Sequence, residues 1–115
     1  MIQTKNFIIY SLLFLSACSS ATVKSEARSA AARNWLENCA ACHGQEGNPP
    51  SAWADKGMRK FGTMGMSMGF FFGGDKMRAG IARTIREGKG ALMPSFKDKF
   101  SDQEITDLVK YIEEL

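Results

Sequence analysis

The segment Cys39-Ala40-Ala41-Cys42-His43 constrains this 115-residue chain more than any other part of its sequence. Two thiols three positions apart, followed at once by an imidazole, suit three kinds of site. These are a redox-active dithiol, part of a zinc site, and a covalent attachment point for haem. Each needs different support from the rest of the chain, so the surrounding elements and the other possible ligands decide between them.

The dithiol and zinc interpretations both lack that support. A thiol–disulfide oxidoreductase places its cysteines at the start of a helix that follows a strand, where the helix dipole lowers the thiol pKa. Here the pair follows the end of an expected helix, and no β-α-β pattern surrounds it. A structural zinc site needs four ligands, whereas the chain has one histidine, His43, and three cysteines, Cys18, Cys39 and Cys42. The odd number of cysteines also argues against a disulfide framework.

Haem attachment accounts for all three side chains of the motif. In the sequence Cys-x-x-Cys-His, each thiol adds to one vinyl group of the porphyrin. The histidine that follows then faces the iron as its proximal axial ligand. The motif therefore predicts one covalently bound haem c, attached through Cys39 and Cys42 and ligated by His43. Haem c is attached outside the cytoplasm, so an export signal should precede the motif.

Such a signal is indicated by residues 1–17, where Lys5 precedes an apolar run that stops just before Cys18. The run is about half as long as the roughly 20 apolar residues of a transmembrane helix. The tetrapeptide Leu15-Ser16-Ala17-Cys18 resembles the lipobox of bacterial lipoproteins. That resemblance implies a signal peptide over residues 1–17, an acylated Cys18 and a lipid-anchored tether over residues 18–25. Cleavage at another small residue, without lipidation, is the alternative.

Ser19 and the overall charge bear on location and partners. In Gram-negative lipoproteins an Asp after the cysteine usually signals retention in the inner membrane, so Ser19 favours the outer membrane, facing the periplasm, or the cell exterior. A formal net charge of +3 is too small to indicate nucleic-acid binding. The basic residues expected around the haem could still steer docking to an acidic redox partner.

Three segments have helical periodicity and together indicate an all-α fold. Residues 25–39 are rich in alanine and contain neither glycine nor proline. Residues 75–87 carry apolar side chains four positions apart, and glycines follow them. Residues 102–115 carry a continuous apolar stripe, and Ser101 with Glu104 predicts a capping box at its start.

Residues 44–74 show no regular period because glycine and proline interrupt them, so the sequence predicts a long loop. In so small a chain a loop of this length suggests a ligand to wrap around. Met64, Met66 and Met68 alternate within it and would share one face of an extended chain, where thioethers suit Cu(I). The favoured alternative is that these methionines and Phe70–Phe72 line the haem edge as apolar filler.

A second axial ligand is expected from a methionine, because a thioether suits a low-spin electron carrier. Met77 belongs to the apolar stripe of residues 75–87 and is more suited to the core. Met93 lies in an extended loop, where Pro94 disfavours helical backbone and neighbouring glycines allow a close approach. Met93 is therefore better placed than Met77 to approach a bound haem, and Met58, Met64, Met66 and Met68 remain open.

The segments ENCAACHG, TIREGKGALMPSF and FSDQEITDLVKYIEEL together resemble class I cytochrome c, the family of small monohaem electron carriers. The resemblance covers about residues 28–44 and 77–115. It implies an all-α domain over residues 26–115, with three to four helices wrapped around one covalently bound haem. It also implies that Trp35 and Tyr111 meet where the first and last helices cross.

The same resemblance implies further site residues. Met93 would be the distal iron ligand, and the carbonyl of Pro49 or Pro50 would orient the His43 ring. Outside the segments that the resemblance covers, the side chains of Trp53, Arg59 and Lys60 are candidates to hydrogen-bond the haem propionates.

The predicted function is electron transfer by a membrane-anchored monohaem cytochrome outside the cytoplasm. With His43 and Met93 on both axial positions, the iron would have no open site and the protein would not be an enzyme. The expected partners are a redox donor, a redox acceptor and, through Cys18, the lipid membrane. One alternative is a haem c subunit of a larger redox enzyme complex, in which an apolar Met/Phe segment would suit an interface. Another is a haem-based sensor or weak peroxidase, which would require that Met93 does not bind the iron.

Overall fold

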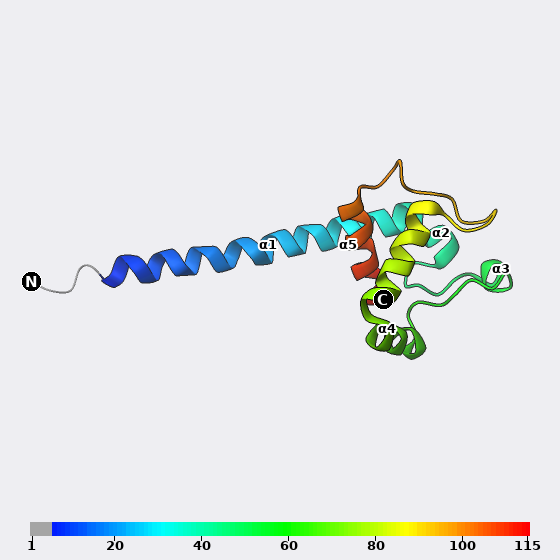
Figure 1. Ribbon diagram of the computed structural model, residues 1–115, viewed down its shortest axis with the longest axis horizontal. Coiled ribbons are helices and arrows are strands. Elements are labelled where there is room, and N and C mark those ends of the chain that lie inside the picture. The colour runs from blue at the N-terminus through cyan, green and yellow to red at the C-terminus, as the bar shows by residue number, and fades with distance from the viewer. Residues whose placement is uncertain (1–5) are drawn as a thin grey trace, which may run out of the picture.

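A computed structural model describes the backbone of residues 6–115 and the side chains of residues 20–115. Within this part the chain is all-α, and its only β-type pairing is an isolated bridge between Lys89 and Met93. Figure 1 shows one long helix projecting from a small bundle of the others. In chain order the helices are α1 (Asn6–Asn38), α2 (Ala40–His43), α3 (Ser51–Ala54), α4 (Met64–Glu87) and α5 (Asp102–Glu113).

Helix α1 is longer than the sequence predicts. It was expected over residues 25–39, but it begins at Asn6 and includes residues 18–25, the expected tether, as continuous helix. The molecule is consequently 77 Å long and only 31 Å and 24 Å across. In the part of the chain that is described, no helix is long and apolar enough to cross a membrane. The side chain of Cys18 lies outside the described residues, so its acylation stays a prediction.

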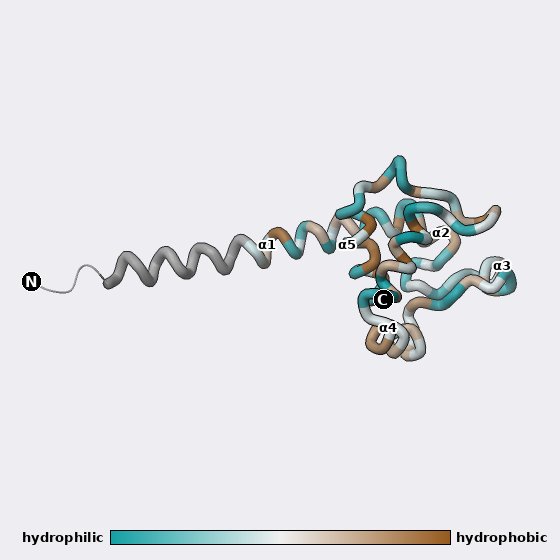
Figure 2. The backbone as a smooth tube through the Cα atoms, in the orientation of Figure 1, coloured by the Kyte–Doolittle hydropathy of each residue, from teal (hydrophilic) through white to brown (hydrophobic). Residues whose placement is uncertain are grey.

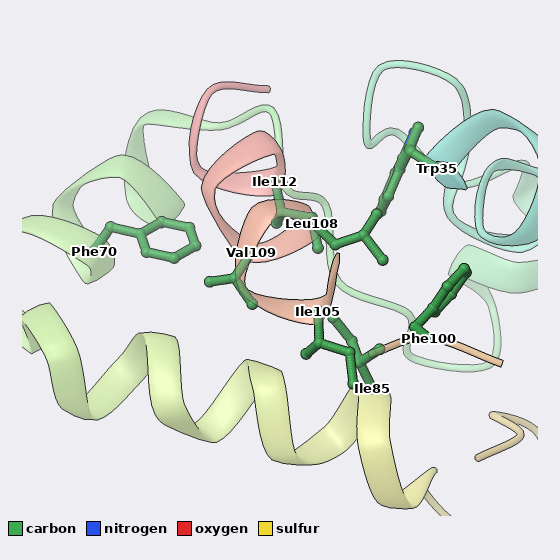
Figure 3. Packing of buried hydrophobic residues seen from close by; sticks show 8 residues of the cluster. All are labelled: Trp35, Phe70, Ile85, Phe100, Ile105, Leu108, Val109 and Ile112. Atoms are coloured by element: carbon green, nitrogen blue, oxygen red, sulfur yellow. The ribbon is translucent and has the colours of Figure 1, made fainter. Parts of the chain in front are cut away.

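The core forms where α1 crosses α5. Trp35 is only 1% exposed, and its ring centroid lies 6.3 Å from that of Tyr111, which confirms the expected aromatic contact between the first and last helices. Figure 3 shows Trp35 directed toward Leu108, which is fully buried. The indole Nε1 donates a hydrogen bond to the carbonyl oxygen of Gln45 at 2.9 Å, so the polar end of this buried ring is satisfied.

Helix α5 follows the sequence closely. The Ser101 hydroxyl accepts a hydrogen bond from the Glu104 amide at 3.2 Å, and the Glu104 carboxylate accepts one from the Ser101 amide at 2.8 Å. The predicted capping box is therefore confirmed. The apolar stripe of the helix is buried against α1 and α4, at Ile105, Leu108, Val109 and Ile112.

The prediction of a loop over residues 44–74 is wrong for its last third. Helix α4 begins at Met64 and consists of two helical halves that meet at Gly74, whose φ of 49° and ψ of −134° are not helical. Thr63 caps the first half by accepting a hydrogen bond from the Met66 amide at 3.3 Å. Phe70 anchors that half because its side chain is buried in the core. Capping and burial outweigh the low helix propensity of the glycines.

Two of these glycines allow the halves of α4 to approach each other closely. A Cβ atom on Gly69 would lie 3.2 Å from the sulfur of Met77, and one on Gly73 would lie 2.9 Å from the Met77 Cβ. Both glycines are on the first half and Met77 is on the second. The bend at Gly74 therefore depends on the absence of side chains on the face that meets Met77.

We expect Gly73→Ala to destabilise the haem-loaded protein by about 1–3 kcal/mol, the usual cost of overpacking a core contact. Gly65→Ala is the matched control, because it lies on the same half-helix and the atom nearest to its added methyl group is 3.9 Å away. That control should be neutral or slightly stabilising, since alanine is the better helix former. Denaturant unfolding of both variants measures the difference, and equal effects would contradict the proposed packing.

An ion pair joins α4 to α5 and predicts how stability depends on pH. The Arg78 guanidinium donates to both carboxylate oxygens of Glu113, at 2.8 Å and 2.5 Å. These hydrogen bonds hold the pKa of Glu113 below its ordinary value of 4.5. A carboxyl group with a lower pKa when folded stabilises the fold above its unfolded pKa, and this contribution is lost as the pH falls through the folded value.

Glu113→Gln should therefore unfold more easily at pH 7 and lose less stability than the wild type on acidification below about pH 5. Thermal unfolding between pH 7 and pH 3 is the measurement. Glu37→Gln is the control, because Glu37 is exposed on α1 and makes no ion pair within the described residues. An acid dependence unchanged by Glu113→Gln would show that the ion pair does not contribute.

Candidate functional site

A cavity of about 660 Å³ lies between α1, α4, α5 and two loops. Its volume is within the range of roughly 300–1,000 Å³ that is typical of ligand and cofactor sites. Most of the wall is apolar, and the core residues Trp35, Ile85, Leu108 and Ile112 in Figure 3 form part of it. The cavity is therefore continuous with the hydrophobic core, so a ligand in it would complete that core.

Four of the predicted site residues, Cys39, His43, Arg59 and Met93, line this cavity. Cys39 and His43 are held together by a tight turn, in which the His43 amide donates to the Cys39 carbonyl at 2.9 Å. Cys42 lies in the same turn, half-buried, and is not part of the cavity wall. Neither Cys39 nor Cys42 forms a disulfide bond. Burial raises the pKa of Cys39 to about 11, so its thiol is protonated at neutral pH.

Met93 reaches the cavity from the loop after α4. The amide of Lys89 donates to the Met93 carbonyl at 3.0 Å, and the Met93 amide donates to the Lys89 carbonyl at 3.2 Å. The Phe96 amide also donates to the Ile85 carbonyl of α4, at 3.0 Å. These bonds fix an otherwise irregular segment, so Met93 is held in place although it lies outside any helix.

His43 is in the form that binds a metal. Its ring lies between Trp35 and Phe61, with centroid distances of 5.7 Å and 5.5 Å. Burial lowers the pKa of the imidazole, so the ring is neutral at pH 7 and one nitrogen has a free lone pair. Nδ1 is buried and has no hydrogen-bond partner in the described part of the chain. Two thiols, a neutral imidazole and a thioether beside one apolar cavity are a residue set that fits covalently attached haem.

The two prolines considered for orienting His43 differ in their surroundings. The Pro50 carbonyl caps α3, where it accepts hydrogen bonds from the amides of Trp53 and Ala54, both at 2.9 Å. Pro50 is exposed, whereas Pro49 is buried. His43 Nδ1 has no hydrogen-bond partner in the described part of the chain, so neither proline carbonyl is bonded to the ring. The orienting role of Pro49 or Pro50 stays a prediction.

The proposed propionate ligands are also separated. Arg59 lines the cavity, but Trp53 and Lys60 do not. Trp53 is instead covered by Lys56, whose ammonium lies 4.3 Å from its ring centroid. Lys56 itself lines the cavity, so the cationic groups there are Lys56, Arg59 and Lys89. Lys56 was expected only as one of several basic residues around the haem, because one lysine among many has no distinguishing pattern.

The methionines and phenylalanines of residues 64–72 do not act as one group. Residues two apart on a helix point in nearly opposite directions, so Met66 lines the cavity while Met64 and Met68 are exposed. The premise of the copper hypothesis, an extended chain with three thioethers on one face, is therefore wrong. The filler interpretation holds for Met66, whereas Phe70 is in the core and Phe71 and Phe72 face outward.

Comparison with known proteins places this geometry in a family. The profile described as cytochrome c oxidase, cbb3-type, subunit III matches residues 26–112. The chain belongs to this family. It is 35% identical over 79 residues to the cbb3-type cytochrome c oxidase subunit FixP of Azorhizobium caulinodans, and the match covers 68% of this chain and 24% of that protein. It is 33% identical over 79 residues to subunit CcoP of Azospirillum brasilense, covering 69% and 25%.

The chain thus spans about a quarter of the length of these curated relatives. A solved structure, the KustC0563 c-type cytochrome, is 28% identical with a TM-score of 0.60 and covers 72% of this chain and 93% of that one. The predicted all-α fold is confirmed, and the chain contains a c-type cytochrome domain, whose role is electron transfer. Such a domain implies covalently bound haem c.

We expect Met93→Ala to abolish the methionine–iron charge-transfer band of the oxidised, haem-loaded protein, because alanine cannot ligate iron. Three other methionines line the same cavity, so the matched controls are Met58→Ala, Met66→Ala and Met77→Ala. These should retain the band. Survival of the band in Met93→Ala, with its loss in one of the controls, would assign the ligand to that other methionine.

Proposed function

We propose that this chain is a haem c-bearing electron-transfer component of a larger membrane redox complex of the oxidase type. Cys39 and Cys42 would attach the single haem, with His43 and Met93 as axial ligands. The observation that carries the proposal is that His43 and Met93, from opposite ends of the domain sequence, line one cavity beside the Cys39 thiol.

The chain's own residues would hold, insulate and orient the cofactor. Bound haem supplies an iron centre that gains and loses one electron. His43 is available as a neutral ligand because its surroundings lower its pKa. The apolar wall excludes water, and the cations Lys56 and Arg59 lie where they can pair with propionates. Occupation of both axial positions would leave no place for a substrate, so the domain would carry electrons without catalysing a reaction.

A subunit of a complex is a better interpretation than a freely diffusing shuttle. The matched family and both relatives described above carry the name of a cbb3-type oxidase subunit. Sequence similarity to subunits supports assembly with redox partners, whereas the sequence alone favoured independent diffusion. In this proposal the domain faces the periplasm and is attached to the membrane through acylated Cys18.

Extraction of native membranes in a mild detergent tests this proposal. We expect the haem-containing chain to elute in size exclusion with other redox subunits, at a mass well above that of the single chain in a detergent micelle. A small soluble c-type cytochrome added to the same extract is the control for non-specific association. Elution as a lone chain, with its haem intact, would instead support the free shuttle.

A further inference from the structure

The outward face of the first half of α4 is an apolar surface that the haem site does not use. Met64 and Phe71 are each 81% exposed, Phe72 is 76% exposed and Met68 is 51% exposed. We call these four side chains the α4 patch. They are four of the seven large apolar side chains exposed in the described part of the molecule. Figure 2 shows this half of α4 at the edge of the domain, coloured brown to white.

The helix that carries the patch is fixed in its orientation. On its inner side Met66 lines the cavity, Phe70 is buried in the core, and Gly69 and Gly73 contact Met77. Rotation that hid the α4 patch would withdraw Phe70 from the core. The exposure is therefore built into the fold, and none of the described residues covers the patch.

The size of the patch argues against a stable protein interface on this surface alone. A phenylalanine contributes about 150–250 Å², so the four partly exposed side chains present about 500–600 Å² together. A stable protein interface buries about 800 Å² on each partner. A second copy of this chain, docked patch to patch, would fall short of that area.

The chemistry of the patch also favours lipid over protein. Protein interfaces contain about one hydrogen bond per 100–200 Å², but residues 64–73 contain no charged side chain. Their one hydroxyl, on Ser67, donates to the Thr63 carbonyl at 3.3 Å. The flanking residues Lys60 and Lys76 are exposed and suit anionic headgroups, while the acidic neighbour Asp75 is paired with Arg78 at 3.2 Å.

The position of the helix permits contact with the membrane to which the chain is proposed to be anchored. In Figure 1 the first half of α4 lies at the lower edge of the domain, to one side of the α1 axis. The α4 patch is therefore exposed on the outside of the bundle, where a bilayer can reach it.

We propose that residues 64–73 form a second membrane contact, in which the α4 patch enters the headgroup–acyl boundary of an anionic bilayer. Apolar and aromatic side chains flanked by cations are typical of interfacial segments. Two contacts, one at each end of the molecule, would fix the orientation of the cavity relative to the membrane. This inference rests on the proposed function only in that it places the chain at a membrane.

The test uses the haem-loaded, lipidated full chain carrying Phe72→Cys, reconstituted into vesicles of phosphatidylcholine and phosphatidylglycerol. A nitroxide spin label reacts selectively with the new cysteine, because the other three thiols would be occupied by thioether bonds or by acylation. Collision with oxygen, which concentrates in lipid, is compared with collision with a water-soluble nickel complex. Gln103→Cys at the exposed start of α5 is the matched control, on the opposite edge of the domain.

We expect the label at position 72 to collide more with oxygen than with nickel, and the label at position 103 to show the reverse order. The double variant Lys60→Gln, Lys76→Gln should lower the oxygen collision rate and raise the nickel collision rate of the label at position 72.

A label at position 72 that collides more with nickel than with oxygen in vesicles overturns the proposal. Protection of the label from nickel that appears only when the native complex is added also overturns the proposal. That result would indicate that the α4 patch docks on a protein, and it leaves the proposed function intact. If the label at position 72 contacts lipid but the native chain elutes alone after detergent extraction, this inference is supported and the proposed membership of a complex is contradicted.

Discussion

The contact between Trp35 and α5 is the constraint on which the site depends. Trp35 packs on Leu108 and Tyr111 and is tied to Gln45 through its indole nitrogen. One turn later, the Cys39 amide donates to the Trp35 carbonyl at 2.9 Å, so the helix that Trp35 locks in place ends at the first thiol. The turn that carries His43 then begins from a fixed point. Weakening this crossing would therefore misplace the proximal side of the cavity before any ligand was changed.

The distal side depends on α4 in the same way. Its second half contributes Ile85 to the core and ends where the loop to Met93 begins. Close packing secures this junction: a Cβ on Gly88 would lie 2.7 Å from the Met93 carbonyl oxygen, and Gly88 has a φ of 78°. Glycine is required there because another residue would be strained and would collide with the loop. The two sides of the cavity are thus each set by the end of a helix that packs on α5.

The parts of this architecture that the sequence predicted are those with local signals. The Ser101–Glu104 capping box and the Cys39–His43 motif are each complete within a few residues, so no distant contact was needed to recognise them. Residues 64–73 were mistaken for a loop because their glycines lower helix propensity, whereas Phe70 burial and the Met77 contact, which stabilise the helix, are tertiary. Helix α3, which the Pro50 carbonyl caps, likewise had no clear periodic signal in the sequence.

The same half-helix separates the cavity from the apolar exterior. Met66 lies on the cavity side and Met68 on the outer side, about 200° around a helix whose diameter is roughly 10–12 Å. Contacts made by the α4 patch therefore occur one helix away from the cofactor cavity, without sharing a side chain with it. Substitutions of Phe71 or Phe72 should leave the cavity wall in place, because neither forms part of it. Substitutions of Gly69 or Gly73 should have a different effect, because a larger side chain there would displace both Met77 in the cavity wall and the α4 patch. Such substitutions would alter the cavity and the exposed surface together.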